Sequence, residues 1–569
     1  MTMRRLLRTG LVLVLALGLA ACASLPTAGE ARPGLQQTGQ SDQDTDVTFL
    51  AVGPVRGASP ETIVRGFIEA GVSPADNWAI AREFLSVDLA QKWKPDAGVT
   101  IDVSSSSRRY DAPDPGEGDQ SSVRLSLDQT ATVDAAGVYS AFVAPGSADL
   151  TFQLGKDADG QWRITSAPDG ILLEASSFAA ADVYSPYSLQ YFDPTWTHLV
   201  PDVRWFPKRK NTATRIAQAL ISGKPAPWLA GSVRTAFSGD IALARDAVTV
   251  DSQVADVALT AAAFTADPKT LARMRTQLEQ SLAAVGVLQV RLTVNGRDLE
   301  TSGATVASTA VDARPLVLTD AGFGYLSGGD VQAVPGISAQ LADFPQQVRS
   351  IEASGAADRL VVQAEDGGVY AIADGRVDEL DPRPGLVRPA LDPFGYVWSV
   401  PGNAPGALQV TSTAVVPHPM PGLGDATAVG RIAMSRDGGR LAAVVSAGSQ
   451  TRVEVLGVAR DDKGEPTGLG QPSSIAWPSG SVLDLAWLND TTLGILVQDG
   501  ARTVLLEQPI GGPARTTDVA STARSVAAAN PTTNVRLLGT GGILWVRSGP
   551  TWQPESDKVK ILATQLGAP

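Results

Sequence analysis

Cysteine and histidine are the two residue types that this sequence nearly lacks, with one cysteine and two histidines among 569 residues. A single thiol cannot form an internal disulfide or a cage of thiolates around a metal. The two histidines, His198 and His418, fall in different predicted domains, so they support neither a His-rich zinc site nor a proton relay. Each is better explained as a structural or loop residue than as a catalytic base. We therefore predict that the protein is not an enzyme and holds no metal and no cofactor.

Short catalytic motifs are missing as well. The sequence contains no G-x-S-x-G elbow, no G-x-x-x-x-G-K-[ST] phosphate loop, no H-E-x-x-H and no C-x-x-C. With 59 acidic residues some pair of carboxylates is always available, but no spacing singles one pair out. An envelope hydrolase that uses an unrecognised carboxylate pair stays as an alternative.

Positive charge is also in short supply. There are 46 Lys and Arg residues against 59 Asp and Glu, a formal net charge of -13. This balance argues against nucleic acid as a partner, because phosphates require a clustered excess of cations. Hydrophobic residues make up 44% and charged residues 18%, which is enough apolar material for sizeable cores. A chain of this length is expected to form about three or four domains.

The first residues have the pattern of a lipoprotein signal peptide. A basic start with Arg4 and Arg8 precedes an uncharged stretch, 9–21, that is shorter than the roughly 20 residues needed to span a membrane. The stretch runs into Leu-Ala-Ala-Cys, which resembles the lipobox, where two small residues precede the modified cysteine. Because the single cysteine, Cys22, stands at that position, we predict residues 1–21 as the signal peptide and Cys22 as the lipidation site.

Lipidation of Cys22 would place a diacylglycerol on its sulfur and an acyl chain on its nitrogen. Several chains make a durable anchor, because each buried CH₂ contributes about 0.8 kcal/mol. Residues 22–46 lack apolar periodicity, and after the lipidated cysteine they are predicted to form a flexible tether. We expect a lipid anchor in the cell membrane at its extracytoplasmic face. The alternatives are a cleaved secretory signal with an incidental cysteine, or an uncleaved anchor.

Residues 47–183 are predicted to form an α+β domain. Ser59-Pro60 has the signature of a helix start, and Ser73-Pro74 predicts a second helix that carries the apolar residues of 78–89 on one face. Alternating apolar residues and an Asp-Gly turn then predict antiparallel strands. Two helices followed by a curling antiparallel sheet are similar to the cone-shaped NTF2-like fold.

Residues 184–312 are predicted to form a small α/β sandwich. Its clearest helix begins at Asp267-Pro268, has apolar residues every three or four positions, and stops before Gly286. Residues 288–294 alternate as a half-buried strand that ends in an Asn295-Gly296 turn. The resulting order is strand, helix, strand, helix, strand.

Residues 315–569 are predicted to form a β-propeller. Helical periodicity vanishes, and short strands with Gly, Asp and Pro turns take over. A weak repeat is visible, because residues 391–398 (LDPFGYVW) resemble residues 434–441 (MSRDGGRL). Repeats of about 40–50 residues with a turn between two apolar strands are typical of propeller blades, and the length allows about five or six of them. An elongated pair of β-sandwiches is the alternative.

Trp228 is the candidate binding residue of the mature chain. Prolines hold it in an irregular loop, Pro225-Ala-Pro227-Trp228-Leu229, so it is a better contact candidate than the tryptophans of the strands. The equally favoured alternative is that its indole packs against Leu220.

Several short motifs in the 184–312 region carry a family resemblance: Tyr191-Phe192-Asp193, LVPDVRW at 199–205, ALISG at 219–223, Pro227-Trp228-Leu229, VRTAF at 233–237 and LTVNG at 292–296. Together with the lipobox, the tether, the first domain and the propeller, they resemble the actinobacterial LpqB lipoproteins. The resemblance identifies the 184–312 region as a GerMN domain, named from spore-germination proteins.

The resemblance implies no enzyme and supplies no catalytic residue. Proteins of this family are lipid-anchored outside the cytoplasmic membrane and associate with the extracytoplasmic part of the sensor histidine kinase MtrB. Through it they influence the response regulator MtrA of this two-component system, and with it cell-envelope homeostasis and division. The expected partners are a kinase ectodomain and the membrane. The alternative is an envelope lipoprotein that binds cell-wall glycan, with peptidoglycan as its partner, motivated by Trp228 and the aromatic residues of the propeller region.

The lipidation site gives a direct prediction. We expect Cys22→Ser to abolish lipidation and to leave the precursor uncleaved by the lipoprotein signal peptidase, because the acyl groups need the thiol. Metabolic labelling with a palmitate analogue checks this, and label retained by the Cys22→Ser chain would contradict the assignment.

Overall fold

The computed structural model describes residues 51–567 except 238, 414–415 and 530–533. The predicted signal peptide, Cys22 and the predicted tether lie outside the described residues. Within the described part, no helix is long and apolar enough to cross a membrane.

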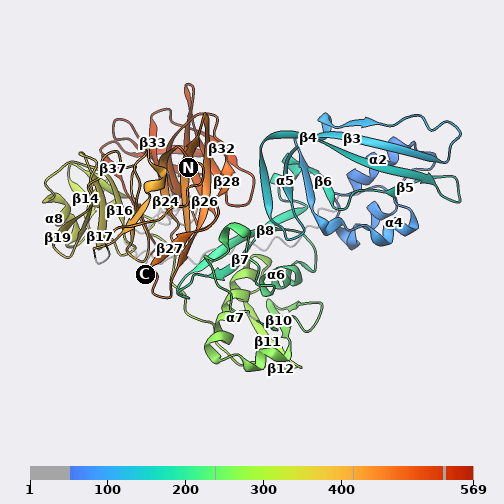
Figure 1. Cartoon of the computed structure of the whole chain (residues 1–569), viewed down its shortest axis with the longest axis horizontal. Helices are drawn as coiled ribbons and strands as arrows, with labels where there is room; N and C mark the ends of the chain where they lie inside the picture. The colour runs from blue at the N-terminus through green and yellow to red at the C-terminus, as the bar shows by residue number, and fades with distance from the viewer. Residues whose placement is uncertain (1–50, 238, 414–415, 530–533, 568–569) are drawn as a thin grey trace, which may run out of the picture. The chain divides into compact units, whose positions relative to one another are not determined.

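The first domain is α+β, as predicted, with helices packed on a sheet of order β5-β4-β3-β1-β6 and β2 beside β3. Paired strands are antiparallel except β1 and β6, which run parallel. Figure 1 shows α2 and α4 beside strands β3 to β5, and one apolar core joins the helices to the sheet. The elements are α2 (Pro60–Ala70), α3 (Ala79–Arg82), α4 (Val87–Lys92), β1 (Val99–Asp102), β2 (Arg109–Asp111), β3 (Gln120–Val133), β4 (Tyr139–Lys156), β5 (Trp162–Ser166), β6 (Ile171–Glu174) and α5 (Ala175–Ala179).

Helix α2 begins where the sequence predicts. The Ser59 hydroxyl accepts a hydrogen bond from the backbone nitrogen of Thr62 at 3.3 Å, and Pro60 fills the first turn. The helix buries the side chains that the periodicity marks as apolar, Ile63, Val64, Phe67 and Ile68.

The second predicted helix, from Ser73-Pro74, is wrong. The segment forms a short 3₁₀ turn followed by α3 and α4, because the backbone φ is positive at Asp76, Asn77 and Trp78. This left-handed turn lets Trp78 point into the core, where its side chain is fully buried and its indole N–H donates to the carbonyl of Gly71 at 2.9 Å. Asp and Asn adopt the left-handed region at a lower conformational energy than most residues, so this break in the helix costs less here.

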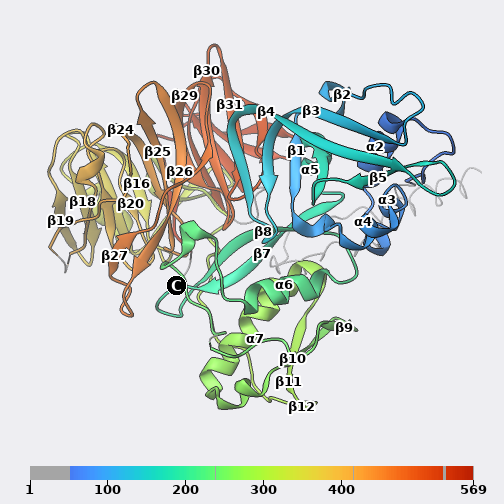
Figure 2. The same cartoon turned by 45° about the vertical axis from the view of Figure 1, so that its right-hand side comes forward.

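The second domain combines the β7–β8 hairpin with a small sheet of order β12-β11-β10-β9. Strands β10 and β11 are parallel and are linked by α7, while α6 and α7 contact each other (Figures 1 and 2). The elements are β7 (Tyr184–Phe192), β8 (Leu199–Pro207), α6 (Thr212–Ile221), the 3₁₀ helix η4 (Pro227–Leu229), β9 (Thr249–Asp251), β10 (Val254–Leu259), α7 (Pro268–Leu282), β11 (Gln289–Val294) and β12 (Arg297–Asp298).

Helix α7 confirms the clearest sequence prediction. The Asp267 carboxylate accepts hydrogen bonds from the backbone nitrogens of Lys269 at 2.9 Å and Thr270 at 3.1 Å, which caps the helix. Gly286 has a φ of +78°, as a residue just past a helix end requires. The following strand starts at Gln289, so Leu288, predicted to be part of it, lies outside and is 69% exposed.

The third domain consists, within the described residues, of six sheets that we call blades 1 to 6 in chain order. Blade 1 contains β13 (Leu316–Thr319), β14 (Gly322–Ser327), β15 (Asp330–Ala333) and β37 (Ile561–Leu562), and blade 2 contains β16 (Val348–Ala353), β17 (Arg359–Ala364), β18 (Val369–Ala373), β19 (Arg376–Asp381) and β38 (Thr564–Gln565). Blade 3 contains β20 (Ala390–Leu391), β21 (Val397–Ser399), β22 (Gln409–Thr411) and β23 (His418–Pro419), and blade 4 contains β24 (Ala428–Met434), β25 (Arg440–Ala447), β26 (Gln450–Arg460), β27 (Pro466–Leu469) and β28 (Ser473–Ala476). Blade 5 contains β29 (Ser481–Trp487), β30 (Thr492–Asp499), β31 (Arg502–Pro509) and β32 (Arg515–Val519), and blade 6 contains β33 (Ala523–Ala529), β34 (Asn534–Gly539), β35 (Leu544–Ser548) and β36 (Thr551–Ser556).

The blades close into a ring. One strand of each blade, β37, β16, β20, β24, β29 and β33 in ring order, contacts the next, and β33 contacts β37 again. Closure is made by the last strands of the chain, since β37 pairs antiparallel with β13 of blade 1 and β38 pairs parallel with β16 of blade 2. The predicted propeller is therefore confirmed and the pair of β-sandwiches is wrong. A short helix, α8 (Ile337–Ala342), interrupts a region predicted to hold strands alone.

The weak repeat in the sequence marks the turn between the innermost and the second strand of a blade. In blade 3 the backbone nitrogen of Asp392 donates to the carbonyl of Tyr396 at 3.0 Å. In blade 4 the backbone nitrogen of Ser435 donates to the carbonyl of Arg440 at 2.9 Å. The two halves of the repeat thus occupy equivalent places in adjacent blades, which confirms the repeat.

A buried ionic network links β16, the segment just before β20, β24 and β29. Arg431 Nε lies 2.6 Å from Asp484 Oδ1, and Arg388 Nη2 lies 2.8 Å from Glu352 Oε1. Arg388 Nη1 also lies 3.9 Å from Asp484 Oδ2, so two positive and two negative charges balance. Burial raises the pKa of Asp484, but the charges of Arg431 and Arg388 outweigh it, so the pKa lies below its usual value.

We expect Asp484→Ala to destabilise the propeller by about 3–5 kcal/mol at neutral pH, because it leaves a buried arginine without its partner. Since the folded pKa of Asp484 is lowered, its contribution is complete above the unfolded value of about 3.9 and is lost as the pH falls through the lower folded value. The gap in unfolding free energy between the natural chain and the variant should therefore shrink in acid. Urea unfolding followed by tryptophan fluorescence at a series of pH values measures it.

Asp518→Asn is the matched control. Asp518 and its partner Arg502 are each 70% exposed, so their pair is screened and should contribute little. A destabilisation at Asp484 no larger than at Asp518 would contradict the role given to the network.

Candidate functional site

Of the site residues predicted from the sequence, Trp228 lies in the described part of the chain. Cys22 lies outside it. The ring of His198 stands edge-on to Phe394 with 5.7 Å between ring centroids, while His418 Nε2 lies 3.4 Å from the carbonyl oxygen of Pro466. Among the described residues no group of three His, Cys, Asp or Glu side chains is placed to hold a metal ion.

The feature that organises the described domains is the β7–β8 hairpin of the second domain. Its turn is fixed by Asp193, whose carboxylate accepts hydrogen bonds from the backbone nitrogens of Thr195 at 2.9 Å, Thr197 at 2.7 Å and His198 at 2.6 Å. The strands pair in register from Tyr184 to Phe192 and from Leu199 to Pro207. Because the side chains of β8 alternate, the strand can contact different domains with successive residues.

Trp205 of β8 connects three domains. Its indole packs in the core of the first domain, with ring centroids 4.2 Å from Phe178 and 6.4 Å from Tyr139. The indole N–H donates to the carbonyl of Gly511, in the β31–β32 turn of blade 5, at 2.7 Å. The backbone nitrogen of Trp205 donates to the carbonyl of Gly137 in the first domain at 2.8 Å. One residue of the second domain therefore bonds both of its neighbours.

Asp202 and Arg204 form a buried pair on the same strand. Arg204 makes two hydrogen bonds to the Asp202 carboxylate, at 3.0 and 2.7 Å, and donates a third to the carbonyl of Ala136 in the first domain at 3.0 Å. Asp202 also accepts from the backbone nitrogen of Ala226 at 2.8 Å, which holds the segment before η4. Burial alone would lower the pKa of the Arg204 guanidinium, but its hydrogen bonds and charge interaction with Asp202 raise it.

The end of the hairpin near its turn lies on two turns of the propeller, the ones that the sequence repeat marks at residues 391–398 and 434–441. His198 contacts Phe394 of blade 3, and the side chain of Val200 lies against Gly439 of blade 4, where a Cβ would come within 3.0 Å of Val200 Cγ2. The turns that the sequence repeat marks are therefore the surface to which the second domain binds.

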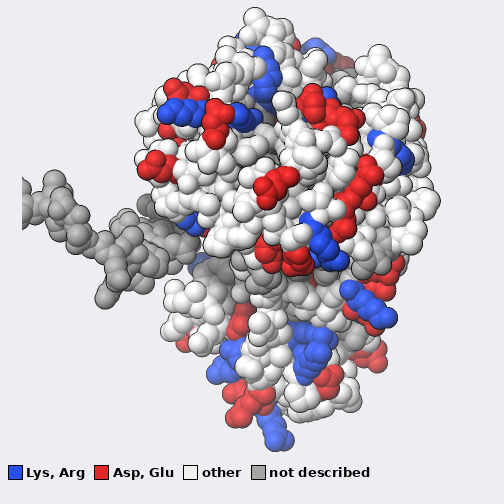
Figure 3. All heavy atoms as spheres, turned by 90° about the vertical axis from the view of Figure 1, so that its left-hand side faces the viewer, with Lys and Arg blue, Asp and Glu red and all other residues white. Residues whose placement is uncertain are grey.

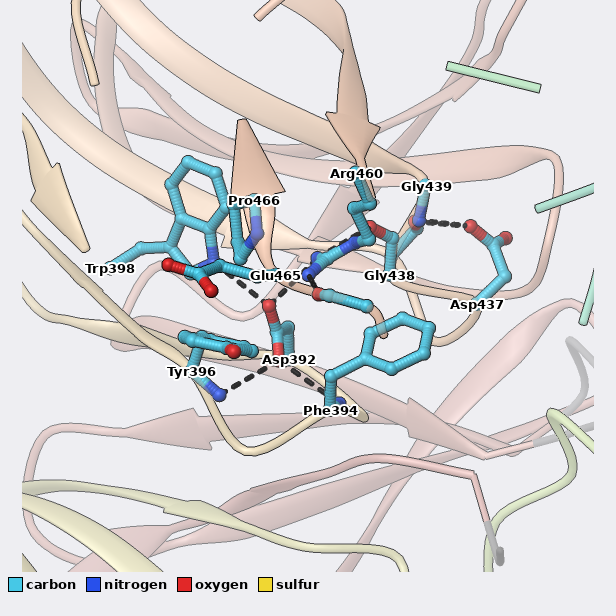
Figure 4. A network of polar contacts seen from close by, with 12 residues as sticks. Asp392, Phe394, Tyr396, Trp398, Asp437, Gly438, Gly439, Arg460, Glu465 and Pro466 are labelled. Carbon is cyan, nitrogen blue, oxygen red and sulfur yellow. Dashed lines mark hydrogen bonds and ion pairs between the residues drawn. The ribbon is translucent and has the colours of Figure 1, made fainter. Parts of the chain in front are cut away.

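Figure 4 shows how the blade 3 turn is held for this contact. Asp392 Oδ1 accepts from the backbone nitrogens of Phe394 at 3.0 Å and Tyr396 at 2.9 Å, and Oδ2 accepts from Trp398 Nε1 at 3.1 Å. Arg460 of blade 4 donates to the same Oδ2 at 2.7 Å, and both side chains are fully buried. The Arg460 guanidinium lies 4.5 Å from the centroid of the Phe394 ring, so the network fixes the ring that His198 contacts.

Trp228 lies in the η4 segment at the same junction. Its side chain is half-buried and packs against a cluster of blades 4 and 5 that includes Val453 and Val455. A Cβ at Gly457 of β26 would lie 2.8 Å from the carbonyl oxygen of Trp228, so the two backbones are in close contact. The structure thus places Trp228 between domains, and its binding of an external partner stays a prediction.

Surface charge on the face drawn in Figure 3 is mixed, with acidic and basic side chains scattered among neutral ones. A face of this kind gives no single-sign field to attract a polyanion.

A cavity of about 450 Å³ opens at the same junction, between the hairpin, α7, residues 306–309 and the β29–β30 turn of blade 5. Sequence reasoning missed both the cavity and the docking role of the hairpin. The available signal was the LVPDVRW motif, which places Asp202, Arg204 and Trp205 on one strand.

Three family models match the chain. They are described as "Lipoprotein LpqB, N-terminal domain" over residues 53–179, "Sporulation and spore germination" over residues 187–300, and "Lipoprotein LpqB beta-propeller domain" over residues 323–561.

Curated relatives carry the same description in several actinobacteria. The chain is 28% identical to Lipoprotein LpqB of Bifidobacterium longum, covering 86% of each chain, and 25% identical to that of Mycobacterium tuberculosis, covering 97% of each. It is 32% identical to that of Thermobifida fusca over 51% of this chain, and there it spans only 46% of the relative. Among solved structures, TolB from Acinetobacter baumannii is 12% identical with a TM-score of 0.34, over 44% of this chain and 66% of that one.

The close backbone contact at Gly457 predicts how the junction can be opened. We expect Gly457→Ala to destabilise the packing of η4 by about 1–3 kcal/mol, because the new methyl must displace the backbone at Trp228. Hydrogen–deuterium exchange of residues 226–232 should rise, while the ring of blades stays protected.

Gly468→Ala is the matched control, since a Cβ at Gly468 of β27 meets nothing within 4 Å. Equal exchange at residues 226–232 in the two variants would show that the contact at Gly457 does not hold η4.

Proposed function

Because the chain belongs to the LpqB family of actinobacterial lipoproteins, we propose that this envelope lipoprotein binds and modulates a sensor histidine kinase. In this proposal Cys22 carries the lipid, the anchor holds the protein at the extracytoplasmic face of the cell membrane, and the ectodomain of an MtrB-like kinase is the partner. The result is control of a two-component system for cell-envelope homeostasis and division.

The observation that carries the proposal is the junction at the β7–β8 hairpin. Trp205 bonds the first domain and the propeller together, and His198 and Val200 add contacts to two further blades. A multidomain body held together in this way can present surfaces from more than one domain to a partner at the same time. The family models that cover these domains describe no enzyme family, which favours a binding role over a catalytic one.

Modulation requires a difference in affinity. A bound protein shifts a two-state kinase only if it binds one state more tightly, and a tenfold shift needs about 1.4 kcal/mol of differential binding. A lipid anchor helps by confining both proteins to one surface, which raises their effective concentration without any new contact.

Reconstitution tests the proposal. We expect the full-length lipidated chain to change the autophosphorylation rate of the kinase in proteoliposomes. The Cys22→Ser chain should need a higher bulk concentration for the same effect, because it lacks the anchor. A kinase rate that is the same with and without the lipidated chain would overturn the proposal.

Cross-linking of the full chain to the kinase ectodomain, read by mass spectrometry, locates the contact. Gly457→Ala, which perturbs the junction, is compared with Gly468→Ala, which does not. If the assembled junction matters for signalling, the Gly457 variant alone should lose part of its effect on the kinase.

A further inference from the structure

The cavity at the junction has the size of a ligand site. Its volume of about 450 Å³ falls within the roughly 300–1,000 Å³ of small-molecule sites in proteins. Five segments line it: β7 and β8 of the hairpin, the end of α7, residues 306–309, and residues 489–491 of blade 5. It therefore lies between two domains, which is a preferred place for such sites.

The lining contains polar and apolar groups in nearly equal parts and is almost uncharged. Its polar residues include Ser188, Gln190, Gln280, Asn489, Asp490 and Thr491. Among the described residues that line it, none is Lys, Arg, His or aromatic. A phosphate or carboxylate would find no cation there, and an apolar ligand would leave the amide and hydroxyl groups without partners.

Asp490 is the single charged residue of this described lining. Its Oδ2 accepts a hydrogen bond from the Thr309 hydroxyl at 2.8 Å, whereas its Oδ1 is buried without a hydrogen-bond partner among the described residues. Burial lowers the pKa of nearby Arg436, and the charge of Asp490 opposes that shift. The charge of Arg436 therefore partly offsets that of the Asp490 carboxylate.

The walls of the cavity are fixed by their backbones. The backbone nitrogen of Gln190 donates to Ser281 Oγ at 2.8 Å, and the Gln190 carbonyl accepts from Gln277 Nε2 at 2.8 Å. The nitrogen of Ala307 donates to the carbonyl of Thr197 at 2.8 Å. These three backbone groups are thus satisfied within the protein.

We propose that this cavity binds a neutral polyhydroxylated ligand of the carbohydrate class, a short glycan. Sugar hydroxyls both donate and accept, which matches a lining of amides, hydroxyls and one carboxylate. A glycan there would contact the hairpin and blade 5 together and so tighten the junction between them. The inference does not depend on the kinase. It assigns the glycan binding that the sequence analysis offered as an alternative to this cavity.

Calorimetry with the full-length chain in detergent tests the site. The probes are the neutral disaccharide N,N′-diacetylchitobiose, its cationic deacetylated form, and inorganic phosphate. We expect the neutral disaccharide to bind and phosphate not to bind, because the described lining contains a carboxylate and no cation. The cationic form measures how much the Asp490 carboxylate adds to binding. Hydrogen–deuterium exchange should fall at residues 306–309 and 489–491 on binding.

Two variants place the site. Asp490→Asn should weaken binding by about tenfold, because it removes a charged acceptor, and Ala307→Phe should weaken it similarly by filling the cavity. Asp320→Asn is the matched control, since Asp320 lies on an exposed turn with its side chain 86% exposed. All three variants are first checked for unchanged melting temperature.

The glycan can come from the intact wall polymer or from a soluble fragment. Sedimentation with purified peptidoglycan, run with and without the disaccharide as competitor, distinguishes these two sources. The proposal is overturned if the neutral disaccharide does not bind, if binding survives both cavity variants unchanged, or if phosphate binds instead. None of these measurements involves a kinase, so failure here is separate from failure of the signalling proposal.

Discussion

The indole of Trp205 is the interaction on which the arrangement of the described domains depends. Its ring belongs to the core of the first domain, its N–H bonds the carbonyl of Gly511 in blade 5, and its backbone belongs to the hairpin of the second domain. Tryptophan suits this place because it offers a large apolar ring and a single polar donor at its edge. Neighbouring residues of β8 extend the same arrangement, with Arg204 bonded to the first domain and Val200 packed on blade 4.

Buried charges serve these contacts by holding turns in shape. Asp392 organises the blade 3 turn through two backbone nitrogens and an indole, and Arg460 neutralises it from blade 4. Such pairs add little net stability over apolar packing, because both groups must first be desolvated. Their value here is geometric, since they fix the Phe394 ring that the hairpin contacts.

Local signals in the sequence predicted the elements that depend on neighbours along the chain. Helix α7 follows from the Asp267 cap and its apolar spacing, and the propeller turns follow from the repeat around Asp392. The helix predicted from Ser73-Pro74 failed because the burial of Trp78 overrides local periodicity. The candidate site could not be predicted in this way, since Trp205 and Gly511 are 306 positions apart. The ring was predicted only as five or six blades, because its closure depends on β37 and β38, strands too short to give a periodic signal.

The way the ring closes has a consequence for how the chain folds. Blade 1 receives its innermost strand from residues 561–562, and blade 2 receives a partner strand from residues 564–565. While these residues are still missing, a growing chain has an open ring with two unsatisfied strand edges, which are sites of mispairing. Contacts of such long sequence separation form slowly, so the propeller can finish folding only after its last strands have been synthesised. The hairpin is synthesised before the propeller. The propeller turns on which it docks are therefore completed only after the hairpin has left the ribosome.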